Sequence, residues 1–413
     1  MKTRRSYWQE TLKSTFWFTP AVTATSLLGL LLLAELLENK VPRDLPLWLW
    51  RGNTVEGTRL LLSSIATAAM TVVGVLFSVT IVVLQQVSQQ YTPRVIENFI
   101  RSLFNQFVLG FYIGTFGYAM LLLRSLPEEG RAPLLAPFIA ILLAMICLAL
   151  LIYFVHHIAK GIKSNTILAG ITRQAVATLA DLQNDMKGEG SHNLAPAGDP
   201  ATQFEATFTS KNSGYLQDVN WQELRSLLSG IRWWGELCVT PGDYLHQGAR
   251  LICIHTSIRL EAERESKIVA LFHIDLTRTH SQDVRFGVRQ MADMALRALS
   301  PGINDPTTAI EALNEIGTVL LHYTRHCDFS RPVVFPDGSW LQLKQPSYKA
   351  FVDLCFNEIA LAGKDHYSVQ ERIQDILRHC QQVAGSERAH ILSVKSEQLR
   401  REFGSVSGST LFS

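Results

Sequence analysis

The sequence predicts a membrane protein with four transmembrane helices, followed by a cytosolic α+β domain that contains a small β-barrel-like or sandwich-like module. Three observations support this fold class. Of the 413 residues, 47% are hydrophobic and only 18% are charged, and the mean hydropathy is +0.12. The apolar residues are concentrated in the first 160 positions. After residue 210, short apolar runs alternate with turn residues, which is typical of strands.

Four apolar runs are long enough to cross a hydrocarbon core of about 30 Å. They cover residues 16–37, 60–84, 107–123 and 134–155. Lys and Arg precede the first run and follow the last, so the positive-inside rule predicts that both termini are cytoplasmic. The first run has spanning length and no clear cleavage site, and we expect it to remain as a signal anchor. Residues 1–160 are therefore predicted to form the transmembrane domain.

The second run carries no charge from residue 60 to residue 91 and has an ordered polar pattern. As a helix it would be roughly 45 Å long, which is longer than the hydrocarbon core. Small and polar residues recur in it at steps of three, four or seven, which places them on one helical face. This stripe consists of Ser64, Thr67, Thr71, Gly74, Ser78 and Gln85.

Two interpretations of the stripe remain open. Small and hydroxyl residues let helices approach closely and hydrogen-bond across a packed interface. Alternatively, several copies of the chain could present the stripe to a shared axis and line a water-filled pore of weak selectivity. Thr80 lies off the stripe and does not fit a strict division.

Two further segments near the membrane have simpler interpretations. The third run contains Gly110 and Gly114 in a GxxxG spacing, which predicts close helix packing. Residues 94–107 have an apolar side, which favours an amphipathic helix on the inner membrane face or a helix packed against the cytosolic domain.

The remaining chain divides by composition into a helix and linker (161–210), a β-rich module (211–280), a helical domain (281–403) and a disordered tail (404–413). Residues 231–255 resemble half of a barrel-sandwich hybrid, the fold of lipoyl and biotinyl carrier domains. No lysine stands at the hairpin tip where such carriers are modified, so a structural β module is expected. We also expect a strand at 267–276, helices at 284–299 and 306–322, and a hairpin that turns at Pro336-Asp337-Gly338.

The corner between the two predicted helices, ALRALSPGINDPTTA (295–309), is rich in capping residues. Pro301 cannot continue the first helix. Asp305 is a strong N-cap candidate for the second helix, and Pro306 suits its first position. A turn explains most of this string. The alternative is an anion or ligand site at the helix N-terminus, formed by Arg297, Ser300, Asn304, Asp305, Thr307 and Thr308.

Several classes of function find no support in the sequence. The net charge of +2 argues against a broad nucleic-acid-binding surface. The six cysteines form no CxxC pattern, so neither a metal site nor a disulfide framework is expected. No Gly-rich phosphate loop, nucleophile elbow or HExxH motif occurs, and we predict neither catalytic residues nor a cofactor. An unrecognised membrane-bound enzyme is the weakest alternative.

Three stretches together resemble the DUF2254 family of bacterial predicted membrane proteins. They are MTVVGVLFSVTIVVLQQVSQQYTPRVIENF, PGDYLHQGARL and RFGVRQMADMALRALSPGINDPTTAIEAL, and the similarity extends from the first apolar run to about residue 325. The resemblance implies a bacterial inner-membrane protein and brings no established activity or catalytic residue.

From these observations we expect a homo-oligomeric, channel-like protein of the inner membrane. Its partners would be the lipid bilayer, other copies of the chain and a small anion or ligand at the cytosolic domain. The alternative is a non-conducting scaffold or sensor whose cytosolic domain binds a ligand.

Overall fold

The computed structural model describes residues 17–38, 54–90, 103–128, 133–161, 163–186, 204–326, 332–335, 337–344 and 347–403. The chain forms two compact units, Met1–Lys163 and Ser164–Ser413. Residues 187–203 of the predicted helix and linker (161–210), the predicted tail at 404–413 and most of the amphipathic segment at 94–107 lie outside the described residues.

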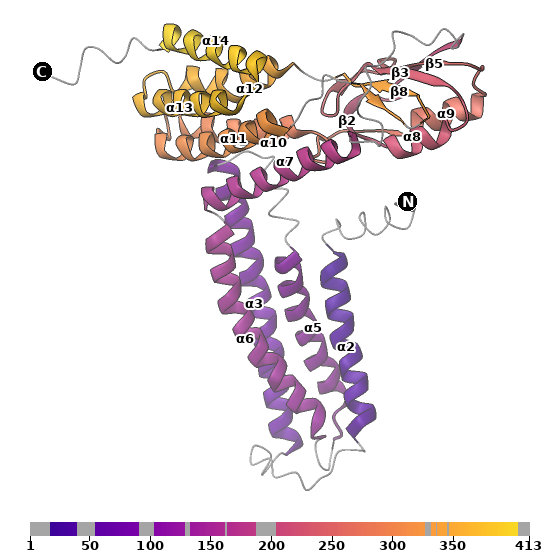
Figure 1. Ribbon diagram of the computed structural model, residues 1–413. Helices are drawn as coiled ribbons and strands as arrows, with labels where there is room; N and C mark the ends of the chain where they lie inside the picture. The colour runs from indigo at the N-terminus through magenta and orange to yellow at the C-terminus, as the bar shows by residue number, and fades with distance from the viewer. Residues whose placement is uncertain are drawn as a thin grey trace, which may run out of the picture. The chain divides into compact units, whose positions relative to one another are not determined.

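The first unit contains four helices that are long and apolar enough to cross a membrane, which confirms the predicted spans (Figure 1). They are α2 (Phe18–Glu38), α3 (Val55–Gln90), α5 (Leu103–Ser125) and α6 (Leu135–Gly161). The helix α5 begins at Leu103, so Leu103 and Phe104 belong to the third membrane helix and not to the amphipathic segment predicted before it. The 36 residues of α3 span about 54 Å at 1.5 Å per residue, which exceeds the apolar core of a bilayer.

The helix α5 is the centre of this bundle. In its most apolar window 61% of the residues are buried, compared with 22% in each of the other three spans. The predicted GxxxG contact is present and is made with α2. A Cβ added at Gly110 would lie 2.6 Å from the Cα of Pro20, and one at Gly114 would lie 2.9 Å from the Cα of Ala24. Only glycine allows the two backbones to approach this closely.

Polar contacts hold α6 against the other helices of the bundle. The hydroxyl of Tyr112 donates to the carbonyl of Cys147 at 2.7 Å, and that of Tyr118 donates to the carbonyl of Ala136 at 2.9 Å. The carboxylate of Glu38, at the end of α2, accepts from the backbone N–H of Leu135 at 3.0 Å. An acidic group at a helix N-terminus satisfies N–H groups that have no intrahelical partner.

The second unit begins with α7 (Ser164–Met186) and continues with a β module. A five-stranded sheet has the order β1-β5-β3-β8-β7, and a three-stranded sheet has the order β4-β2-β6. The strands are β1 (Phe204–Thr209), β2 (Gly214–Val219), β3 (Trp233–Leu237), β4 (Tyr244–Leu245), β5 (Arg250–Thr256), β6 (Phe272–Asp275), β7 (Val333–Val334) and β8 (Trp340–Gln342). The described strands form two sheets over a shared apolar core, which is sandwich-like and not a closed barrel.

Two features of this module differ from the sequence-based predictions. β8 pairs in parallel with β3, and β1 pairs with β5. Strands from the predicted linker (161–210) and helical domain (281–403) therefore belong to the same sheet as strands of the predicted module (211–280). The strand predicted at 267–276 was wrong in its first part, because residues up to Ala270 belong to helix α9 (Ala262–Ala270) and only β6 is extended.

The rest of the second unit is helical. α8 (Trp221–Leu227) lies between β2 and β3 along the chain. The helices α10 (Val284–Ala298), α11 (Pro306–His326), α12 (Tyr348–Ala362), α13 (Tyr367–Val383) and α14 (Ser386–Phe403) pack together (Figure 1). The predicted helices at 284–299 and 306–322 and the hairpin formed by β7 and β8 are confirmed.

Candidate functional site

The predicted hydroxyl stripe lies on an exposed face of α3 in the single chain. Ser64, Thr67, Thr71, Gly74, Ser78 and Gln85 are all exposed. The side of α3 that packs on the bundle carries a different set: Leu62, Ala66, Ala69, Val73, Leu76 and Val83 are buried. At about 100° per residue the two sets fall on opposite sides of the helix. Thr80, which did not fit the stripe, is half-buried. The stripe is therefore not explained by packing among the helices of its own chain.

Gly74 supports the same conclusion. No atom lies within 4 Å of the place that a Cβ would occupy there. Glycine in a helix interior costs about 1 kcal/mol relative to alanine, and nothing in the chain itself requires it at this position. By contrast, Gly110 and Gly114 each meet a neighbouring backbone.

Two of the stripe hydroxyls bond to their own helix. Thr71 Oγ1 donates to the carbonyl of Thr67 at 2.8 Å, and Ser64 Oγ donates to the carbonyl of Leu60 at 2.8 Å. A hydroxyl has one donor and two acceptor lone pairs, so its oxygen can still accept a hydrogen bond from water or approach a cation. The exposed face of α3 thus presents uncharged oxygen atoms.

The exposed surface of α6 shows what a lipid-facing helix of this chain looks like. Its exposed large side chains include Leu142, Met145, Leu148, Ile152 and Val155. Apolar side chains also flank the stripe on α3, where Val75 and Ile81 are more than half exposed. The polar surface of α3 is therefore a narrow strip between apolar neighbours.

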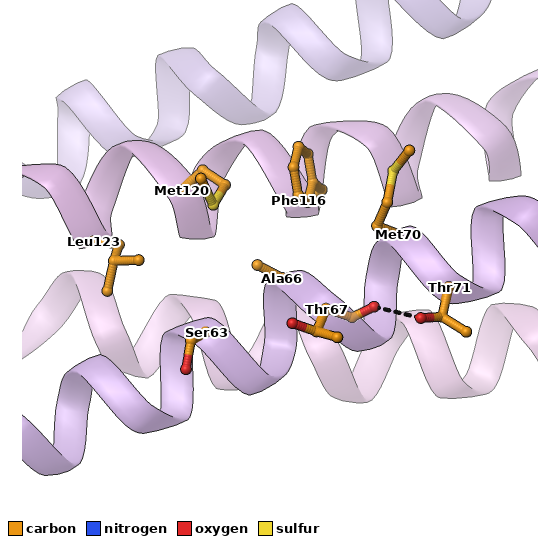
Figure 2. Close-up of a pocket in the computed structure, with 8 residues that line it drawn as sticks. All are labelled: Ser63, Ala66, Thr67, Met70, Thr71, Phe116, Met120 and Leu123. Atoms are coloured by element: carbon orange, nitrogen blue, oxygen red, sulfur yellow. Dashed lines mark hydrogen bonds between the residues drawn. The ribbon is translucent and has the colours of Figure 1, made fainter.

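A groove lies between α3 and α5, beside the part of the stripe at Thr67 and Thr71 (Figure 2). Its volume is about 440 Å³. From α3 it is lined by Ser63, Ala66, Thr67, Met70 and Thr71, and from α5 by Phe116, Met120 and Leu123. The α3 wall carries hydroxyl groups together with the side chains of Ala66 and Met70, whereas the α5 wall is apolar. The groove is therefore of mixed polarity.

The second predicted site, the corner at 297–308, is a well-bonded turn between α10 and α11. The Asp305 carboxylate accepts from the backbone N–H of Thr308 at 3.1 Å and from the Thr308 hydroxyl at 2.6 Å, which confirms Asp305 as an N-cap. The Thr308 hydroxyl is also the main reason why the pKa of Asp305 is lowered. Such a cap stabilises a helix by about 1 kcal/mol.

The structure also explains Asn304 and Ser300, which a simple helix–turn–helix corner does not require. Asn304 has a φ of 50°, a left-handed conformation that asparagine tolerates better than most residues. The Ser300 hydroxyl donates to the carbonyl of Arg297 at 2.7 Å, and the Ser300 carbonyl accepts from the N–H of Asn304 at 2.9 Å. Asp305 already accepts from the N–H group of Thr308, whereas Nε of Arg297 is buried without a hydrogen-bond partner among the described residues. Ligand binding at this corner stays a prediction.

A buried ionic cluster that the sequence did not predict joins the β module to α10. Asp283 is 3% exposed and caps α10 by accepting from the N–H of Phe286 at 3.2 Å. Arg278 donates to the same carboxylate through Nε at 2.9 Å and through Nη2 at 2.6 Å. Arg285 donates to the carboxylate of Asp243 and to the carbonyl of Pro241, both at 2.9 Å.

Gly242 explains why this cluster needs the PGD sequence. Its φ is +92°, and an added Cβ would overlap Oδ2 of Asp283. Burial is the largest influence on the pKa of Asp283 and raises it, whereas Arg278 and Arg285 lower it. The two arginines therefore offset part of the effect of burial on this carboxylate. Asp283 and Gly242 are 41 positions apart in sequence, so only the fold reveals their contact.

The four apolar helices and the α+β unit define a membrane protein that carries a large second unit outside its spanning helices. Residues 13–379 match the family described as "Predicted membrane protein (DUF2254)", and the chain belongs to this family. Two of the three motifs that resembled the family, PGDYLHQGARL and the stretch that begins with RFGV, meet at the cluster of Asp283, Arg285 and Asp243.

The curated relatives that match this chain add no activity. Uncharacterized proteins of Mycobacterium bovis and Mycobacterium tuberculosis are 31% identical to this chain over 274 residues, which is 64% of this chain and 52% of each relative. The chain thus spans about half the length of the curated relatives it matches. No solved structure matches it.

Proposed function

We propose that this protein forms a homo-oligomer in the bacterial inner membrane, in which copies of α3 surround an axis and their stripes line a weakly selective ion conduit. The observation that supports this most strongly is the exposure of the stripe on the face of α3 opposite the bundle. Polar surface in a membrane is stable when it faces water or another polar surface. In the proposed oligomer both termini and residues 164–413 are cytoplasmic, and the second unit forms a vestibule or regulatory domain.

The chemistry of the stripe fits weak selectivity. Its residues carry hydroxyls, one amide and a glycine but no charge. Strong selection among ions requires rings of carbonyl oxygens or of charged side chains. Hydroxyl oxygens with free lone pairs can replace part of the hydration shell of a passing ion, although they hold it weakly.

One observation favours a second candidate, a non-conducting oligomer that acts as a scaffold or sensor. The hydroxyls of Ser64 and Thr71 already donate within their own helix, so they could pack in a dry interface without loss of a hydrogen bond. In that case Gly74 would allow a second α3 to approach closely, and no water would reach the stripe.

Accessibility of the stripe to water separates the two candidates. We expect Thr71→Cys and Ser78→Cys in native membranes to react with a charged, membrane-impermeant thiol reagent well above the level of the parent chain. Leu148→Cys is the control, because Leu148 is 54% exposed near the middle of the apolar helix α6 and should face lipid. If Thr71→Cys and Ser78→Cys react no more than Leu148→Cys, the stripe is dry and the conduit is excluded.

A further inference from the structure

Three potential metal ligands converge on the outer face of the five-stranded sheet. They are Glu205 on β1 and Cys253 and His255 on β5, and one ligand atom from each lies within 4.8 Å of the others. The antiparallel pairing of the two strands produces this arrangement. Glu205 is directly opposite His255, and Thr207 is directly opposite Cys253. Side chains of Cys253 and His255 point to the same face because they are two positions apart on a strand.

The distances fit a tetrahedral ion. Cys253 Sγ lies 3.3 Å from Oε1 of Glu205 and 3.7 Å from Nε2 of His255. A zinc ion binds sulfur at about 2.3 Å and oxygen or nitrogen at about 2.0–2.1 Å, so tetrahedral angles place the sulfur about 3.5 Å from each of the other two ligand atoms. The two sulfur distances therefore need to change by only a few tenths of an ångström. The ligand atoms of Glu205 and His255 lie within 4.8 Å of each other, and a tetrahedral ion would bring them to about 3.4 Å.

We propose that Glu205, Cys253 and His255 bind a divalent ion of the zinc class, with water as the fourth ligand. The set combines a thiolate, an imidazole and a carboxylate, which are the ligands that zinc prefers. A thiolate and a carboxylate together neutralise a divalent charge, so no net charge is placed at the half-buried site. Glu205 is exposed, which leaves room for water in the fourth position.

Neighbouring groups hold two of the ligands in place. The ring of Trp234 stacks on His255 with centroids 3.7 Å apart and planes at 10°. Trp340 stacks in turn on Trp234 at 4.9 Å. The Thr207 hydroxyl donates to Cys253 Sγ at 3.7 Å. Contacts that orient metal ligands in this way raise metal affinity, and their loss typically weakens binding by about 10- to 100-fold.

The test is a titration of the purified full-length protein with Co²⁺, which has visible absorption bands and occupies zinc sites. We expect about one Co²⁺ per chain and a charge-transfer band from thiolate to cobalt, and we expect Zn²⁺ to abolish the band because zinc binds such sites more tightly than cobalt. Cys253→Ser should lose the band. Glu205→Gln should weaken Co²⁺ binding by at least about tenfold.

Cys238→Ser is the matched control. Cys238 is a half-exposed free cysteine that follows β3 in the same sheet and is not one of the three ligands. It should bind Co²⁺ as the wild type does. A wild type without a thiolate band, a Cys253→Ser variant that keeps it, or a Cys238→Ser variant that loses it would overturn the proposal. If Cys253→Ser fails to fold, Glu205→Gln decides, because Glu205 is exposed, and unchanged Co²⁺ affinity in this variant would overturn the site.

Discussion

Replacement of Ser78 by leucine should reduce ion flux through the reconstituted protein by at least about tenfold, because a ring of leucine side chains makes a hydrophobic constriction that excludes water. Ser78 lies on the exposed stripe of α3 and contributes nothing to the buried side of that helix. Assembly should therefore persist. Thr71→Leu should have the same effect two positions earlier along the stripe. The measurement is ion flux into vesicles, with the oligomeric state of each variant checked in parallel.

Thr25→Leu provides the control for this experiment. Thr25 is an exposed hydroxyl residue on α2 that donates to the carbonyl of Ala21 at 2.7 Å, just as Thr71 donates to Thr67. The two substitutions remove the same local hydrogen bond and add the same apolar bulk. If only the face of α3 lines a conduit, Thr25→Leu should conduct normally. Unchanged flux in both Ser78→Leu and Thr71→Leu would remove the pore assignment.

Replacement of Asp283 by alanine should destabilise the second unit by about 3–5 kcal/mol, the usual cost of removing one partner of a buried ion pair. The carboxylate of Asp283 caps α10 and receives two hydrogen bonds from Arg278. Its loss leaves the Arg278 guanidinium, whose side chain is 20% exposed, without its partner. The measurement is urea unfolding of the full chain, followed by a spectroscopic signal from residues 164–413.

Glu263→Ala is the matched control for Asp283→Ala. Glu263 also pairs with a basic side chain, Lys267, at 2.7 Å, but both side chains are more than half exposed. Solvent screens pairs as exposed as this one, so they contribute little to stability. If the two variants lose the same free energy of unfolding, the ion pair of Asp283 does not stabilise the contact between the β module and α10 as we infer.

Sequence reasoning succeeded where local rules decide the structure. The four spans follow from length and the absence of charge, and the N-cap at Asp305 follows from the capping preference of aspartate before proline. The left-handed conformation of Asn304 was not predicted, although asparagine was the available signal. The error at 267–276 has a local cause as well. The i,i+4 pair of Glu263 and Lys267 supports α9, and the alternation of apolar residues after it suggested a longer strand.

The features that sequence reasoning missed depend on contacts between distant segments. Glu205 and Cys253 are 48 positions apart and meet only because β1 pairs with β5. From sequence, Gly242 is an ordinary turn glycine, and its contact with Asp283 is visible only in the fold. Strand pairing of this kind is specified by long-range packing, which a single sequence does not show.

The central claim is that several copies of α3 surround one axis, and the oligomeric mass tests it most directly. The protein should be extracted gently and weighed by native mass spectrometry. We expect a single closed assembly whose mass is a multiple of 46.2 kDa, with more than two copies of the chain. A monomer or dimer would contradict the proposal, because two helices cannot enclose a conduit. The stripe on α3 would then be a packing surface or a lipid-facing strip.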